Sequence, residues 1–383
     1  MLKKRTILTI SVIGVVLTLA IVFFMRIAPF LYQLFWEKTI AIKKKDDAVN
    51  VLILGIGGGT HEGPELTDTI IFANIDIAKN VINLFAIPRD LWIPQLNAKI
   101  NATYALGNNK DAKGLFLTKS VVQDIVGTQI HYVAVIDFQG FVQLVDHLGG
   151  IDVEVKKTLD DYQYPIAGKE QELCGRKEEE LPILATSSSE LEAFPCRYKH
   201  IRFEKGTQHM NGEIALEYVR SRHAKGEEGT DTARSERQQQ VILAMREKLL
   251  SLQILLNPVK LVGAYNIIKD HINTNADPSE YDDFIKLARK MEKASVKSYV
   301  IHYANEVFAS SASGDEEDNK EGLLINPQPS EAFGYQWILI PRIGNGKFEE
   351  IQKYVSCIEQ GNECVITKDG IEKKQPISTT PQQ

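Results

Sequence analysis

The sequence has few of the residue patterns that build zinc sites or common nucleotide-binding loops. It contains only four cysteines in 383 residues, and none lies in a Cys-x-x-Cys or Cys/His spacing typical of zinc. The glycine run 55–59 lacks a following Lys-Ser/Thr, and Thr60 occupies the third glycine position of the dinucleotide pattern. We therefore exclude these sites and interpret the run as a flexible active-site loop.

An excess of positive charge is also missing. The formal net charge is -6, which argues against general affinity for nucleic acid, and we find no helix-turn-helix and no internal repeat. With 44% hydrophobic and 25% charged residues, the chain can form a packed core, and global disorder is excluded. We expect a globular protein with no nucleic-acid partner.

The N-terminus predicts a membrane anchor. Three positive residues, at positions 3–5, precede the uncharged run 6–25, whose length matches the roughly 20 residues of a transmembrane helix. The run is longer than the apolar region of a cleavable signal peptide and has no Ala-x-Ala after it. We expect a cytoplasmic tail (1–5), a single transmembrane helix (6–25), a juxtamembrane linker (26–47) and an extracytoplasmic remainder in the cell membrane.

The four cysteines then fall on the oxidising side of the membrane, where disulfides persist. Two local pairs are plausible among Cys174, Cys196, Cys357 and Cys364. The sequence does not fix their connectivity, and free buried thiols remain the alternative.

Strand and helix patterns alternate along the folded region. The run 49–55 is continuously apolar, as in a buried central strand, and further segments read as a hairpin, two helices and short strands. The predicted elements are 67–77 and 80–90 (hairpin), 113–127 and 141–150 (helices), and 131–138, 151–155 and 335–341 (strands). This alternation predicts an α/β fold.

The remaining segments define the expected domain boundaries. We expect a catalytic domain over 48–255 with a polar surface insertion at about 156–203, then an extension over 256–370 that packs on the core and a disordered tail (371–383). A long amphipathic helix is predicted from Thr232, with Asp231 as its cap.

The strongest chemical signal is a set of five arginines on three predicted elements. Arg89 ends a strand, Arg220 and Arg222 share one face of a predicted strand with Tyr218, and the amphipathic helix begins with Arg234, Arg237 and Gln238. Buried guanidinium groups need carboxylate partners or a bound anion. The structural alternative is an ion-pair network with Asp68, Asp90, Asp231 and Glu236. For so many arginines together we favour a pyrophosphate, which guanidinium binds in bidentate fashion.

A metal site is expected at Asp68. This residue stands where the glycine loop meets a strand, and a carboxylate there can hold Mg²⁺ that also contacts phosphate oxygens. His61 and Glu62 in the same loop are further candidates, although a loop histidine is usually only solvated.

An ordered series of motifs over roughly residues 49–252 resembles the LytR-CpsA-Psr family. The matching positions are the opening strand, Thr67-Asp68-Thr69, Ile87-Pro88-Arg89-Asp90, Lys99-Ile100-Asn101, Asp137-Phe138, Leu148-Gly149-Gly150-Ile151-Asp152, Gly212, Tyr218-Val219-Arg220-Ser221-Arg222, Asp231 and Arg234-Ser235-Glu236-Arg237-Gln238. The resemblance implies an α-β-α fold with a central mixed β-sheet flanked by helices, and a hydrophobic pocket for a polyprenyl tail.

The resemblance also implies a function. Members transfer teichoic acid, capsular polysaccharide or related polymers from a polyprenyl-pyrophosphate carrier to peptidoglycan, at a muramic acid 6-hydroxyl. Their matching arginines hold the pyrophosphate, and their aspartates bind Mg²⁺. One departure is Gly57, which stands where many members have an aspartate that acts as a second metal ligand or base.

These observations predict a Mg²⁺-dependent phosphotransferase. The pyrophosphate-binding residues would be Arg89, Arg220, Arg222, Arg234, Arg237 and Gln238, and the catalytic residues Asp68, Arg89, Arg220, Arg222 and Asp231. Asp68 or Asp231 would accept the proton of the attacking hydroxyl. The alternatives are a polyprenyl-pyrophosphate hydrolase and a non-enzymatic, membrane-tethered regulator or wall-binding protein.

Overall fold

The computed structural model describes most of the chain after residue 38. Its described residues are 39–59, 63–111, 113–177, 189–255, 257–303 and 322–373, with single residues at 14, 21 and 179. The predicted anchor, 6–25, therefore lies outside the described part except for two helical residues, and so does the tail beyond 373. No helix in the described part is long and apolar enough to span a bilayer.

The chain divides into two compact units. The smaller comprises residues 1–43 and 276–293, and its described part contains helix α12 (Tyr281–Lys290) after the 3-10 turn η7 (Pro278–Glu280). The larger comprises residues 44–275 and 294–383 and contains the sheet and every predicted site residue.

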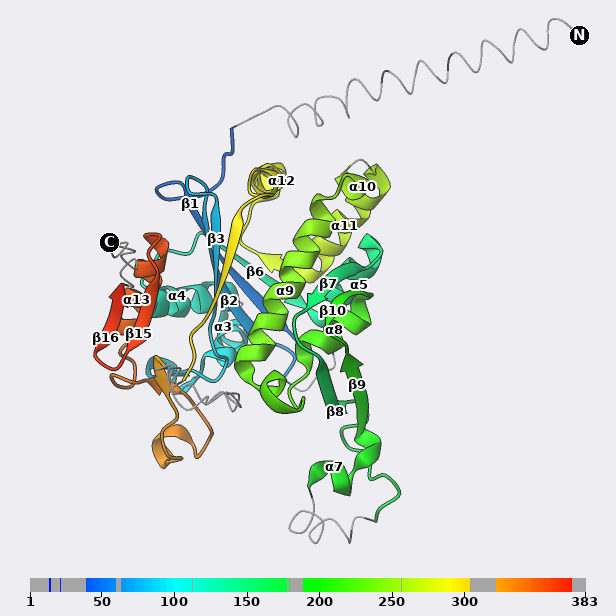
Figure 1. Cartoon of the computed structure of the whole chain (residues 1–383), viewed down its shortest axis with the longest axis vertical. Coiled ribbons are helices and arrows are strands. Elements are labelled where there is room, and N and C mark those ends of the chain that lie inside the picture. The colour runs from blue at the N-terminus through cyan, green and yellow to red at the C-terminus, as the bar shows by residue number, and fades with distance from the viewer. Residues whose placement is uncertain are drawn as a thin grey trace, which may run out of the picture. The chain divides into compact units, whose positions relative to one another are not determined.

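A six-stranded mixed sheet forms the centre of the larger unit (Figure 1). Its order is β11-β6-β1-β2-β3-β12, with parallel pairs β1/β6 and β3/β12 and antiparallel pairs elsewhere. The strands are β1 (Ala48–Ile56), β2 (Thr67–Asp76), β3 (Val81–Ala86), β6 (Tyr132–Asp137), β11 (Ile272–Thr274) and β12 (Ser295–Val300). The predicted central strand, the hairpin and the strand near 131–138 are confirmed.

This pairing brings distant segments to one edge of the sheet. Because β1, β3, β6 and β12 run in the same direction, their carboxyl ends meet there with the beginnings of β2 and β11. We call this the carboxyl edge, and it includes Ile56, Ala86, Asp137 and Val300. Asp68 and Arg89 stand at the same edge, beside the start of β2 and the end of β3.

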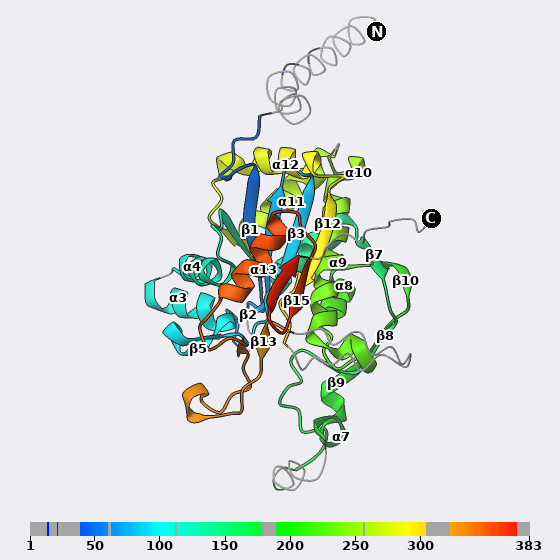
Figure 2. The same ribbon diagram turned by 60° about the vertical axis from the view of Figure 1, so that its left-hand side comes forward.

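Helices cover both faces of the sheet (Figures 1 and 2). One face packs its apolar side chains against α3 (Thr103–Asp111), α4 (Gly114–Val126) and α13 (Glu349–Glu359). The other packs against α9 (Asp231–Leu250), and α5 (Phe138–Leu148), α8 (Gly212–Arg220) and α11 (Pro258–His271) complete that layer. The expected central sheet with flanking helices is therefore present.

The remaining elements are short and lie around these layers. They are the strand pairs β4 (Trp92–Ile93) with β5 (Ala98–Lys99), β7 (Ile151–Val155) with β10 (Gly206–Met210), β8 (Leu159–Pro165) with β9 (Tyr198–Phe203), β13 (Leu324–Ile325) with β14 (Ile340–Pro341) and β15 (Cys364–Thr367) with β16 (Gly370–Lys373), and the helices α7 (Glu190–Ala193) and α10 (Leu252–Leu255). Disulfides join Cys174 to Cys196 and Cys357 to Cys364, so both local pairs are present.

Three local predictions were wrong. Residues 212–220 form helix α8 rather than a strand, because Asn211 caps the helix and Gly212, Ala215 and Tyr218 bury one helical face. The cap of α9 is Thr230, whose side chain accepts from Ala233 N, and Asp231 is the first helical residue. In the segment 335–341, only Ile340–Pro341 is a strand.

Candidate functional site

A small cavity opens at the carboxyl edge, between the sheet and the first turns of α9. Its volume is about 30 Å³, enough for a water-sized group. Charged residues from three predicted elements line it, together with Gln238 and the segment 300–303 at the end of β12. The charged residues are Asp68, Arg89, Asp90, Asp231 and Arg234. The structure thus brings together five of the eight predicted site residues (Asp68, Arg89, Asp231, Arg234 and Gln238).

Arg89 is the centre of a carboxylate group in this cavity. Its Nη1 donates to Asp68 Oδ1, and its Nε lies 3.5 Å from Asp90 Oδ2. Asp90 is buried and also accepts from Lys99 Nζ at 2.6 Å. Burial opposes the charge on Arg89, yet attraction to Asp68 and Asp90 outweighs it and raises the pKa of Arg89. The structural ion-pair alternative is therefore present around this arginine.

The surroundings of Arg234 shift its pKa in the opposite direction from that of Arg89. Its side chain is 11% exposed, and it forms an ion pair with Asp231, at 2.9 Å between Nη1 and Oδ1. Burial, with repulsion from Arg222 and Arg89, lowers the pKa of Arg234 to about 10, although Asp231 opposes this shift. A bound anion would relieve this destabilisation of the charged form, because Asp231 and Asp68 offset burial and repulsion only in part.

Arg220 is the last residue of α8 and Arg222 follows it, and neither side chain lines the cavity. The guanidinium of Arg220 stacks over the Phe138 ring at 4.6 Å, and Phe138 begins α5. Burial raises the pKa of Tyr164 to about 12 against the opposing charge of Arg220, so the two side chains are near each other. Arg222 is exposed, and its charge acts on Arg234.

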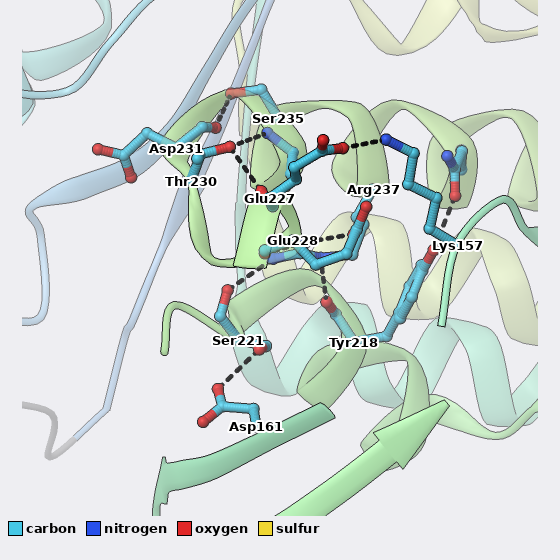
Figure 3. Close-up of polar contacts among 12 residues, drawn as sticks. Lys157, Asp161, Tyr218, Ser221, Glu227, Glu228, Thr230, Asp231, Ser235 and Arg237 are labelled. Carbon is cyan, nitrogen blue, oxygen red and sulfur yellow. Dashed lines mark hydrogen bonds and ion pairs between the residues drawn. The ribbon is translucent and has the colours of Figure 1, made fainter. Parts of the chain in front are cut away.

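Arg237 does not line this cavity. Its side chain is 1% exposed and its Nε donates to Tyr218 O (3.0 Å), its Nη2 to Ser221 O (2.7 Å) and its Nη1 to Glu228 O (2.8 Å) (Figure 3). Glu228 also supplies the carboxylate partner, at 3.1 Å, in place of the expected Glu236. These contacts favour a structural role for Arg237 rather than the expected binding of pyrophosphate. They fix the turn between α8 and α9, which contains the 3-10 turn η6 (Gly226–Gly229).

Sequence reasoning missed one wall of the cavity. Val300, Ile301, His302 and Tyr303 line it from the region beyond the family motifs. Their position follows from the pairing of β12 with β3, which ends at the same edge. The sequence signal for this wall is a short strand-like run that ends in His302 and Tyr303. The run indicates a binding-site wall only once the pairing of β12 with β3 is known.

The described residues contain no group of three His, Cys, Asp or Glu side chains arranged to hold a metal. His61 and Glu62 lie outside the described part. Asp68 is 43% exposed at its side chain and has one oxygen engaged by Arg89. A single such carboxylate fits Mg²⁺ only where water and substrate phosphates supply the other ligands, as is common for this ion.

Known proteins resemble this chain over most of the described region. The LytR_cpsA_psr family model matches residues 34–322. Regulatory protein MsrR of Staphylococcus aureus is 25% identical over 241 residues (62% of this chain, 59% of MsrR), and the Bacillus subtilis transferase TagV is 26% identical over 222 residues (56% and 46%). The chain therefore spans about half of the length of these curated relatives.

Solved structures share the fold. A Streptococcus agalactiae protein, gbs0355, aligns with a TM-score of 0.53 and 22% identity over 83% of this chain and 89% of its own. Lin1025 of Listeria innocua aligns with a TM-score of 0.51 and 21% identity over 82% and 98%. TagV of B. subtilis gives 0.50 and 20% over 83% and 99%. With the family match over residues 34–322, these findings show that the chain belongs to the LytR-CpsA-Psr family.

Proposed function

We propose that this protein transfers a phosphate-linked glycopolymer from a polyprenyl-pyrophosphate carrier to peptidoglycan. The observation that carries the proposal is the cavity in which buried Arg234 is repelled by neighbouring arginines and still faces open space. TagV is named as a polyisoprenyl-teichoic acid to peptidoglycan teichoic acid transferase, which is consistent with this chemistry. MsrR is named as a regulatory protein, which keeps a non-enzymatic role as an outcome of the test.

The reaction is a phosphoryl transfer. The acceptor hydroxyl oxygen attacks the phosphorus next to the glycan, the bond from this phosphorus to the bridging oxygen breaks, and polyprenyl phosphate leaves with the bonding electron pair. Arg89, Arg222 and Arg234 stabilise negative charge on the phosphate oxygens. Asp68 or Asp231 accepts the hydroxyl proton, since both carboxylates border the cavity and remain partly exposed.

Mg²⁺ is the proposed cofactor, with Asp68 as its protein ligand. The ion would neutralise phosphate charge and help the leaving group depart. Because Asp68 already pairs with Arg89, we expect the ion to be held mainly by the substrate pyrophosphate and water. Metal binding should therefore be weak in the free protein and stronger when substrate is present.

The proposed location is the outer side of the cell membrane. The uncharged run 6–25 after the positive residues 3–5 would anchor the chain with its N-terminus in the cytoplasm. A polyprenyl carrier is itself confined to the membrane, so an anchored transferase would share a surface with its donor. The glycopolymer can be teichoic acid, capsular polysaccharide or a related polymer.

The test is product analysis with the full-length protein in detergent micelles. It is incubated with a synthetic polyprenyl-pyrophosphate oligosaccharide, Mg²⁺ and peptidoglycan fragments, and the products are identified by mass spectrometry. We expect a phosphodiester-linked glycan from the wild type and a loss of at least about 100-fold in Arg89→Ala, because one preorganised charge contact contributes on this scale. Arg202→Ala is the matched control, because Arg202 is half exposed on β9 and pairs with Glu204.

Each outcome separates the alternatives. Free glycan phosphate without the acceptor-linked product would identify a hydrolase. An unchanged lipid substrate with several carriers would identify a regulator or wall-binding protein. A product that forms equally with Arg89→Ala would place the reaction outside this cavity.

A further inference from the structure

The segment between α8 and η6 holds Arg222 and is fixed by two separate parts of the fold. Helix α8 ends at Arg220, and the chain then runs beside β8, with a bridge between Asp161 and Ala224. Lys225 N donates to Asp160 O at 2.9 Å. We call residues 220–225 the arginine turn.

Arg237 holds the arginine turn from helix α9. Its Nη2 donates to Ser221 O at 2.7 Å and its Nε to Tyr218 O at 3.0 Å, so it binds the backbone on both sides of Arg220 (Figure 3). These bonds are charge-assisted and fully buried on the arginine side, which makes them stronger than neutral hydrogen bonds. One side of the turn is thereby fixed.

Asp161 holds the same turn from the opposite side. It is fully buried, with 0% exposure, and lies on β8 within the segment 156–203 that the sequence suggests is a surface insertion. Its Oδ2 accepts from Ser221 Oγ at 2.7 Å and from His223 N at 3.2 Å. One carboxylate oxygen therefore binds both neighbours of Arg222, and Figure 3 shows its contact with Ser221.

A carboxylate is a costly choice for joining a strand to a turn. Burying a carboxyl group costs free energy unless its oxygens are hydrogen-bonded, and an apolar pair would pack the same two segments without this requirement. The hydrogen bonds from Ser221 and His223 to Asp161 are directional, and apolar packing is not. They therefore fix the orientation of the backbone from which Arg222 projects.

We propose that Asp161 is a positioning residue that orients Arg222 toward the pyrophosphate. The proposal rests on the proposed function, since it requires Arg222 to bind the reacting group. It makes the base of the 156–203 segment part of the active-site structure. Asp161 itself does not contact the substrate and acts through Ser221 and His223.

A double-mutant cycle on kcat/KM tests this coupling. The full-length variants are Asp161→Asn, Arg222→Ala and the two combined, assayed for glycan transfer as above. We expect Asp161→Asn to lower kcat/KM by about 10- to 100-fold, as a misplaced catalytic contact does. If Asp161 acts through Arg222, the double variant is about as active as Arg222→Ala alone. Independent effects that multiply would overturn the proposal.

A second readout excludes a purely structural role. Binding of inorganic pyrophosphate is measured by calorimetry at a temperature at which circular dichroism shows every variant folded. We expect Asp161→Asn and Arg222→Ala to weaken pyrophosphate binding by similar factors, whereas normal binding by Asp161→Asn would refute positioning. If Asp161→Asn does not fold, Ser221→Ala takes its place in the same cycle, because this variant removes only the contact from Ser221 Oγ to Asp161. The same outcomes are expected.

Asp160→Asn is the matched control. Asp160 is the neighbouring carboxylate on β8, and its side chain accepts from His200 Nε2 at 2.6 Å and lies 3.9 Å from Lys225 Nζ at the far end of the arginine turn. Ser221 and His223, the two neighbours of Arg222, are bound by Asp161 instead. We expect its kcat/KM and pyrophosphate affinity to match the wild type, and a loss equal to that of Asp161→Asn would overturn the proposal. If Arg222→Ala transfers glycan normally, the assigned site of the proposed function fails instead.

Discussion

Replacing Arg234 by methionine should stabilise the protein while it removes transfer activity. The pKa of Arg234 is lowered from its usual range to about 10, first by burial and then by repulsion from Arg222 and Arg89. A pKa this far below the usual arginine value corresponds to at most about 3 kcal/mol of destabilisation of the charged side chain in the fold. Methionine fills similar space without charge.

The attraction to Asp231 is already contained in this pKa, so no separate contribution is subtracted for the ion pair. Asp231 is 38% exposed and therefore stays hydrated when its partner is removed. We expect Arg234→Met to raise the free energy of unfolding, by up to about 3 kcal/mol. The assay is urea unfolding of the full-length protein in detergent, followed by circular dichroism, with the midpoint and slope compared with the wild type.

Arg237→Met is the matched control on the same helix. Arg237 gives hydrogen bonds to three carbonyls and a carboxylate, so its loss leaves buried acceptors unpaired and should cost about 3 to 5 kcal/mol. Opposite signs for the two variants would support the reasoning. A destabilisation of more than about 1 kcal/mol by Arg234→Met would show that burial and repulsion do not strain this arginine.

Three further predictions concern stability and use the same unfolding assay. Burial raises the pKa of Glu359 to about 7 against the opposing charge of Lys79. The contribution of the protonated Glu359 carboxyl to folding stability is therefore fully present below about pH 4.5 and is lost as the pH rises through 7. Glu359→Gln should therefore be more stable than the wild type at pH 8, by up to about 3 kcal/mol, and equal stability there would contradict the pKa shift. Thr230→Ala should lose about 1 kcal/mol because the α9 cap disappears, and Thr230→Ser should retain most of it. Gly150→Ala should lose about 1 to 3 kcal/mol, because φ is +83° and the new Cβ would lie 2.4 Å from His209 Nε2; an unchanged midpoint would refute this strain.

The parts of the fold that the sequence predicts well have local signals. The apolar run of β1, the β2/β3 hairpin and helices α4 and α5 each show their period within about a dozen residues. The strand prediction for residues 212–220 was wrong because the segment is short and the arginines of Arg220-Ser221-Arg222, at its end, alternate as side chains do on a strand. The helical spacing of its buried residues and the Asn211 cap decide the structure.

The edge strands of the sheet have no comparable local signal. β11 pairs with β6 and β12 with β3, across more than 130 residues of sequence in each case. Such pairings depend on tertiary packing, which periodicity does not encode. This is why the 300–303 wall of the cavity, including His302 and Tyr303, was not predicted.

The arginine cluster shows most clearly what the sequence leaves undecided. Arg234 and Arg237 are three residues apart on α9, so they share one side of the helix and have the same sequence signature. In the fold, Arg237 makes four contacts to acceptors, whereas Arg234 pairs with Asp231 and is also influenced by Asp68 and by two repelling arginines. An arginine whose acceptors are all in the protein stabilises the fold, and one whose charge is only partly compensated is available for an anion. The number and sign of tertiary neighbours therefore favour a structural role for Arg237 and leave Arg234 as the proposed anion-binding residue, a distinction that spacing alone does not make.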